Sequence, residues 1–205
     1  MDVMGVMGRQ TGCAPARSTA SAAIIARARG GEEEAFRLIF ERYGKPVISF
    51  IYDIVGQREL AEELAQETFV RAYKGIDRLR DDTKLSTWLF GIAKNVARES
   101  LRSRRRDKAR VDFDDENVPE ATDEGPLPDN LLLSKELGGV IQRALGALDE
   151  DRRLVFSLRI FQQQSYEEIV TITGFSLAKV KTDIHRAKAE MRERIRPYLG
   201  TGYAM

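Results

Sequence analysis

One acidic stretch, VDFDDENVPEATDEGPLPDN at residues 111–130, divides the chain into two parts. It holds three of the six prolines, and from Asp112 to Asp129 there are eight Asp or Glu and no Lys or Arg. Such a segment cannot bury enough apolar surface to order itself, so we expect a flexible linker. The rest of the chain must then fold as two units of about 85 and about 70 residues.

Both parts have the apolar spacing of helices, and neither shows the alternation of a half-buried strand. In the front part we expect helices over residues 31–44, 46–56, 58–76 and 86–106, with Pro46 opening the second and Ser86 capping the fourth. In the back part we expect helices over residues 131–147, 150–161, 165–173 and 177–196. The pattern predicts an all-α fold of two helical domains joined by the acidic linker.

Composition excludes several classes of protein. The chain is 42% hydrophobic and 32% charged with a net charge of +1, which suits a soluble helical protein. No run reaches the ~18 apolar residues of a spanning helix, and the start does not read as a secretion signal, so we expect a cytoplasmic protein. The lone Cys13 excludes an internal disulfide. The domains expected are a disordered tail 1–25, a helical domain 26–110, the linker 111–130 and a helix-turn-helix domain 131–200.

The helix-turn-helix prediction depends on local signals between residues 165 and 188. Ser165 and Glu168 have the spacing of a capping box, Gly174 suits a left-handed helix end, and Ser176 suits an N-cap. The second helix has an apolar stripe of Leu177, Val180, Ile184, Ala187 and Met191. This pattern is typical of helix-turn-helix motifs, whose second helix enters the major groove.

The remaining faces of that helix supply candidate DNA contacts. We expect Lys181, Thr182 and Asp183 to reach base edges, and Lys179, Arg186 and Lys188 to bind phosphates. His185 is a phosphate or packing contact rather than a catalytic base, and Ser176 lies at the helix start. The alternative is a solvated charged face on an ordinary helix pair.

The front domain has two faces of opposite charge. One helix carries Glu59, Glu62, Glu63, Gln66 and Glu67 on one side, a face that repels DNA and should meet protein unless it is merely a soluble surface. The next helix repeats Lys94, Arg98, Arg102 and Arg105 at helical spacing, with Asn95 among them, and this row suits a phosphate backbone and a base edge. Trp88, just before it, stacks on DNA or, as we favour, packs in the core.

Three segments, AEELAQETFVRAY, STWLFGIAKNVARESLRSRRR and SYEEIVTITGFSLAKVKTDIHRAK, together resemble RNA polymerase sigma factors of the extracytoplasmic-function type. The resemblance runs in order from about Glu32 to Arg196, apart from the linker. It implies a promoter-specificity subunit whose partners are core RNA polymerase (the β′ clamp and the β subunit), promoter DNA and an anti-sigma factor. It implies no enzymatic chemistry, no cofactor, no metal and no small-molecule substrate.

The resemblance also assigns roles to residues. It implies that Glu63, Gln66 and Glu67 bind the β′ clamp, and that the −10 element is read by the loop Leu79–Ser86, which includes Lys84, with Lys94, Asn95 and Arg98. It also implies that the last helix reads the −35 element. The chain departs from the family pattern at Val170, Thr173 and Asp183, where alanine, leucine and arginine are usual. A free-standing dimeric regulator with a helix-turn-helix stays open as the alternative. A nucleic-acid enzyme is rejected, because no clustered carboxylates, phosphate-binding glycine loop or nucleophile–base pair is found.

Overall fold

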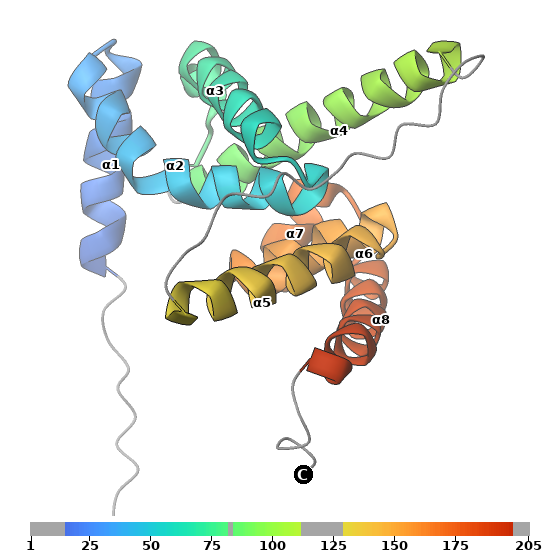
Figure 1. The fold of residues 1–205 in the computed structure, drawn as a ribbon. Coiled ribbons are helices and arrows are strands. Elements are labelled where there is room, and N and C mark those ends of the chain that lie inside the picture. Colours follow the sequence, from blue (N-terminus) through green and yellow to red (C-terminus); the bar gives the residue numbers. More distant parts are fainter. Residues whose placement is uncertain (1–14, 82–83, 112–128, 199–205) are drawn as a thin grey trace, which may run out of the picture.

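The computed structural model describes the backbone of residues 15–81, 84–111 and 129–198, and the side chains of residues 22–81, 84–107 and 138–198. Within these residues the backbone forms eight α-helices and no strand, which confirms the all-α prediction (Figure 1). The predicted linker lies almost entirely outside the described residues.

The front part contains the four helices α1 (Pro15–Arg29), α2 (Glu33–Val55), α3 (Arg58–Gly75) and α4 (Leu85–Val111). Helix α2 is central, since α1, α3 and α4 all pack against it. Helix α1 begins inside the segment 1–25 for which we expected a disordered tail. That expectation is wrong at the end of the segment, because Ile25 is completely buried in the core.

The sequence predicted two helices divided at Pro46, but α2 is one continuous helix that contains this proline. A proline removes one main-chain hydrogen bond and disfavours a helix interior. Burial outweighs this cost here: Ile39 before the proline and Val47, Phe50 and Ile51 after it all lie in one core. The prediction that Ser86 caps α4 is also wrong, because α4 already begins at Leu85.

The back part contains α5 (Asp129–Gly146), α6 (Glu150–Phe156), a π-helical turn η3 (Ser157–Phe161), α7 (Tyr166–Thr173) and α8 (Leu177–Ile195). The predicted capping box is present, since the Glu168 amide donates to Ser165 Oγ at 3.1 Å and the Ser165 amide donates to Glu168 Oε2 at 2.6 Å. Gly174 ends α7 with φ of 75°, in the left-handed region that favours glycine. Local signals thus confirm the helix-turn-helix.

The two parts pack directly against each other, with α4 against α7 and α2 against α6. Figure 1 shows α5–α8 gathered along one side of α2 and α4. A single apolar core joins Phe50 and Leu89 of the front part with Leu158 and Ile172 of the back part. A second, smaller cluster around Leu145, Phe156 and Met191 holds α8 to α5 and α6.

Candidate nucleic-acid interface

The outer face of α8 is exposed and basic. Val180, Ile184, Ala187 and Met191 are buried as predicted, whereas Leu177 is 41% exposed and lies outside the expected stripe. The candidate DNA residues with exposed side chains on this helix are Lys181, Thr182, His185, Arg186 and Lys188. This face has the shape and charge that a major-groove helix needs.

Two of the candidates on α8 are occupied by other contacts. Asp183 is only 7% exposed and forms an ion pair with Lys179, one turn earlier. Lys179 Nζ also lies 3.1 Å from Asp151 Oδ2 of α6. The hydrogen bond from Lys179 to Asp183 raises the pKa of the lysine. This position fits an internal ion pair and does not fit the predicted base contact by Asp183.

The turn before α8 is stabilised by side chains. Thr173 Oγ1 donates to the Ile169 carbonyl at 2.7 Å and accepts from the Phe175 amide at 3.2 Å, so this side chain links the end of α7 to the turn. Ser176 Oγ accepts from the Lys179 amide at 3.2 Å, as expected of an N-cap. The hydroxyl of Ser176 is therefore engaged in positioning α8.

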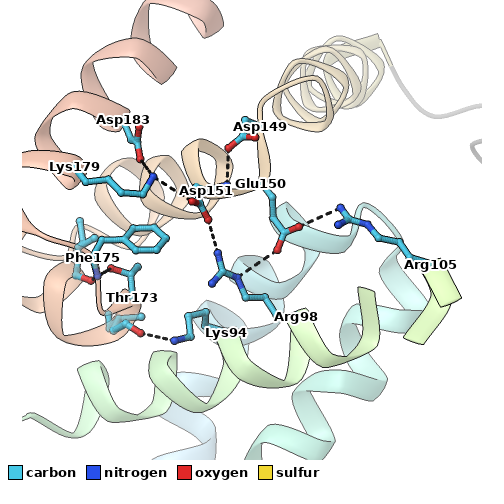
Figure 2. A network of polar contacts seen from close by, with 12 residues as sticks. Lys94, Arg98, Arg105, Asp149, Glu150, Asp151, Thr173, Phe175, Lys179 and Asp183 are labelled. Carbon is cyan, nitrogen blue, oxygen red and sulfur yellow. Dashed lines mark hydrogen bonds and ion pairs between the residues drawn. The ribbon is translucent and has the colours of Figure 1, made fainter. Parts of the chain in front are cut away.

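The basic row on α4 is partly covered by the back part of the chain (Figure 2). Lys94 Nζ donates to the Ile172 carbonyl, 2.8 Å away at the end of α7. Burial, with the nearby positive charge of Arg98, lowers the pKa of Lys94. Arg98 Nη2 lies 2.6 Å from Asp151 Oδ1, and Arg98 Nε lies 3.3 Å from Glu150 Oε1. Lys94 and Arg98 therefore face protein in this arrangement.

The other candidates of the front part remain exposed. Asn95 and Arg102 project from α4, and Arg105 is mostly exposed although its Nη2 lies 3.1 Å from Glu150 Oε2. Lys84, in front of α4, lies 3.6 Å from Asp81. Trp88 is half-buried and packs against the core beside Gly75, which supports the core interpretation.

Glu63, Gln66 and Glu67 form an exposed row on α3. Glu67 Oε1 accepts from Arg71 Nε at 2.7 Å, and Arg71 Nη2 also pairs with Glu99 of α4 at 2.8 Å. The row is therefore fixed to α4 at its end while its outer side faces solvent. An acidic row of this kind offers its charge to a basic protein surface.

An apolar groove of about 850 Å³ continues this row between α2 and α3. Phe40, Val70 and Tyr73 line it and are each 46–50% exposed. Edge-to-face contacts hold the ring of Phe36 against Tyr73 at 5.1 Å and that of Phe40 against Phe69 at 4.8 Å. The groove is not evident from the sequence, because Phe40 and Tyr73 have the helical spacing of core residues. The available signal is that the apolar residues of α2 and α3 cover a wider face than one core-facing stripe.

Two further observations on the described residues concern membrane-spanning helices and metal sites. None of their helices is long and apolar enough to cross a membrane. Among the same residues, no group of three or more His, Cys, Asp or Glu is placed to hold a metal ion.

Comparison with known proteins points to one family. Residues 39–107 match the family described as Sigma-70 region 2, and residues 139–191 match Sigma-70, region 4. The chain is 31% identical over 181 residues to the ECF RNA polymerase sigma-E factor of Escherichia coli K12, covering 86% of this chain and 94% of that protein. It is 29% identical over 181 residues to the RNA polymerase sigma-H factor of Pseudomonas aeruginosa, with the same coverage.

Two solved structures share the fold. The structure of CnrH in complex with the cytosolic domain of CnrY gives a TM-score of 0.63 at 23% identity, covering 87% of this chain and 98% of that one. The sigma factor RpoE in complex with the anti-sigma factor NepR from Bartonella quintana gives a TM-score of 0.64 at 23% identity, covering 78% and 96%.

Proposed function

The chain belongs to the extracytoplasmic-function class of sigma-70 factors, and from this premise we propose how its surfaces are divided among its partners. As a sigma factor it is a promoter-specificity subunit, which binds core RNA polymerase and directs it to promoters. We propose that it acts in the cytoplasm and has no chemistry of its own. We also propose residues 26–110 and 131–200 as its two functional domains, with 111–130 connecting them.

One observation supports this proposal: the acidic row on α3 and its apolar groove form a surface separate from the two basic surfaces on α4 and α8. We assign the polymerase contact to Glu63, Gln66 and Glu67 together with the groove at Phe40 and Val70. The row supplies charge for orientation, and the exposed aromatic groove supplies apolar area for affinity.

The two basic surfaces are assigned to promoter DNA. The first comprises the loop before α4, with Lys84, and the candidates on α4 itself, and it would read the −10 element. The second is the outer face of α8, which would enter the major groove of the −35 element. The front assignment comprises Lys84, Lys94, Asn95, Arg98, Arg102 and Arg105; the rear assignment comprises Lys181, Thr182, His185, Arg186 and Lys188, with Ser176 and Lys179 positioning the helix.

An anti-sigma factor is a further proposed partner. The structural neighbour RpoE was solved bound to such a factor, NepR, and CnrH was solved bound to the cytosolic domain of CnrY. By analogy we expect this chain to be held inactive by a protein of the same kind.

The test is co-purification of the full chain with bacterial core RNA polymerase. Charge reversal of the acidic row in Glu63→Lys/Glu67→Lys is expected to weaken the complex by at least about ten-fold, because the reversed row would then repel the basic partner surface. The control is Glu167→Lys/Glu193→Lys, which reverses two exposed acids of the back part and should bind like wild type. A wild-type chain that ignores polymerase but binds DNA as a symmetric dimer would favour the free-standing regulator instead.

A further inference from the structure

Glu150 and Asp151 are two consecutive acids in the first turn of α6. Negative charge is favourable at this position, since it complements the positive end of the helix dipole. The side chain of Asp149 already caps the helix by accepting from the Asp151 amide at 3.0 Å. The carboxylates of Glu150 and Asp151 are therefore available for contacts outside their own helix.

All four oxygens of these two carboxylates meet a cation (Figure 2). Asp151 Oδ1 lies 2.6 Å from Arg98 and Oδ2 lies 3.1 Å from Lys179. Glu150 Oε1 lies 3.3 Å from Arg98 and Oε2 lies 3.1 Å from Arg105. The two acids thus join the basic row of α4 to the start of α8.

The centre of this network is Arg98, whose side chain is only 20% exposed. Its guanidinium also lies over the ring of Phe175, 5.8 Å from the ring centroid. Isolated surface ion pairs contribute little, but partial burial and a shared network make such contacts stronger. We therefore expect this network to stabilise the contact between α4 and α6 more than isolated exposed ion pairs would.

Two cations of this network, Arg98 and Arg105, are assigned above to DNA. Arginine binds carboxylate and phosphate oxygens through the same N–H groups. Arg98 Nη2 already donates to Asp151, and Arg105 Nη2 donates to Glu150, so each guanidinium has fewer donors left for a phosphate. Nucleic acid and the α6 acids therefore compete for Arg98 and Arg105.

We propose that Glu150 and Asp151 are an autoinhibitory mimic of DNA phosphates, which holds α4 against the back part of the chain and keeps Arg98 and Arg105 from nucleic acid until the two parts separate. This inference rests on the proposed function only in assigning α4 to DNA. Closure is selective, because the outer face of α8 stays exposed while Lys94 and Arg98 on α4 are partly covered. The closed chain therefore keeps the outer face of α8 accessible and engages part of the basic row on α4.

The test uses the full chain without polymerase and the variant Glu150→Gln/Asp151→Asn, which removes both charges with little change in size. Binding to a short, fluorescently labelled single-stranded DNA is measured by anisotropy, and the radius of gyration is measured by X-ray scattering. Because binding to the open state no longer has to displace the acids, we expect roughly ten-fold tighter DNA binding and a larger radius of gyration. The single variant Glu150→Gln, which keeps the Asp151 pair, should give an intermediate gain.

The matched control is Glu167→Gln/Glu193→Gln, which removes two charges from exposed positions of the same part. It should change affinity by no more than about two-fold and leave the radius of gyration unchanged. An equal gain in variant and control would overturn the inference, because net charge alone would explain it. No gain, or a gain without expansion, would also overturn it. Co-purification with polymerase, measured in parallel, reports on the proposed function separately, since neither readout of closure needs polymerase.

Discussion

Ser157 Oγ donates a hydrogen bond to Asp53 Oδ2, and this bond joins α2 in the front part to the π-helical turn after α6. Both residues are buried. The neighbouring carbonyls of α2 are also bound from the back part: Gln142 Nε2 donates to the Tyr52 carbonyl at 3.0 Å, and Arg153 Nη1 donates to the Ile54 carbonyl at 2.9 Å. The C-terminal end of α2 is thus a second polar junction between the two parts, separate from the one at Arg98.

The junction at Asp53 predicts a pH dependence of stability. Burial raises the pKa of Asp53 to about 6, while the hydrogen bond from Ser157 partly opposes this shift. A carboxyl group with a raised pKa stabilises the folded chain fully below its ordinary pKa, and this contribution is lost as pH rises through about 6. Asp53→Asn removes the titration, so we expect it to stabilise the chain at pH 7 by on the order of 3 kcal/mol and hardly at all at about pH 4. Denaturant unfolding across this range measures the difference.

Ser157→Ala is the companion to this variant. It leaves the Asp53 carboxylate without its donor, so it should destabilise the chain by about 1–3 kcal/mol at pH 7 and by less below pH 5. Parallel pH profiles for wild type and Asp53→Asn would refute the assignment of the titration to Asp53.

The turn of the helix-turn-helix gives a prediction about glycine. Gly174 has φ of 75°, where an alanine is strained, so Gly174→Ala should lower the free energy of unfolding by about 1 kcal/mol. Gly91 lies inside α4 with open space around an added methyl group, so Gly91→Ala should raise it by about 0.5–1 kcal/mol. Thermal or denaturant unfolding compares the two, and equal effects would contradict the local geometry.

The charges on α8 predict unequal roles in duplex binding. Arg186→Ala and Lys188→Ala should each lower the slope of log affinity against log salt by about 1, as expected for the loss of one phosphate contact. Lys179→Ala should change this slope less, because Lys179 is already paired with Asp183 and Asp151. A salt titration with a short duplex tests this ranking, and a larger effect at Lys179 would contradict it.

The groove beside the acidic row predicts a polymerase variant that leaves the fold intact. Val70→Lys places a charge in the apolar groove and should weaken polymerase binding by about ten-fold, while stability stays within about 0.5 kcal/mol. The control is Ile160→Lys, at an exposed apolar residue on η3. Affinity measurements with core polymerase compare the two, and equal losses would argue against a specific contact in the groove.

The sequence predicted the parts of the fold that depend on local chemistry. The capping box at Ser165 and Glu168 and the left-handed glycine at Gly174 mark helix ends through neighbouring residues alone, and both were confirmed. Predictions that depended on tertiary packing did less well. Pro46 fails to break α2 because a core spans it, and Leu177 lies outside the buried stripe that its spacing suggested.

In the candidate interface, too, local patterns were predicted from the sequence and tertiary contacts were not. Charge spacing identified the row around Arg98 and the acidic row around Glu63, since helical periodicity places such residues on one face. Spacing does not reveal which anion a cation meets. The pairing of Arg98 with Asp151 joins residues 53 positions apart, and it exists only because the two helical parts pack together.

The most direct test of the central claim is transcription by core RNA polymerase on a library of promoter-containing DNA fragments, with and without the full chain. We predict transcripts that appear only when the chain is present, start downstream of a shared pair of −10 and −35 elements, and disappear with Glu63→Lys/Glu67→Lys but not with Glu167→Lys/Glu193→Lys. A folded chain that yields no dependent transcripts, or transcripts that survive reversal of the acidic row, would contradict this account.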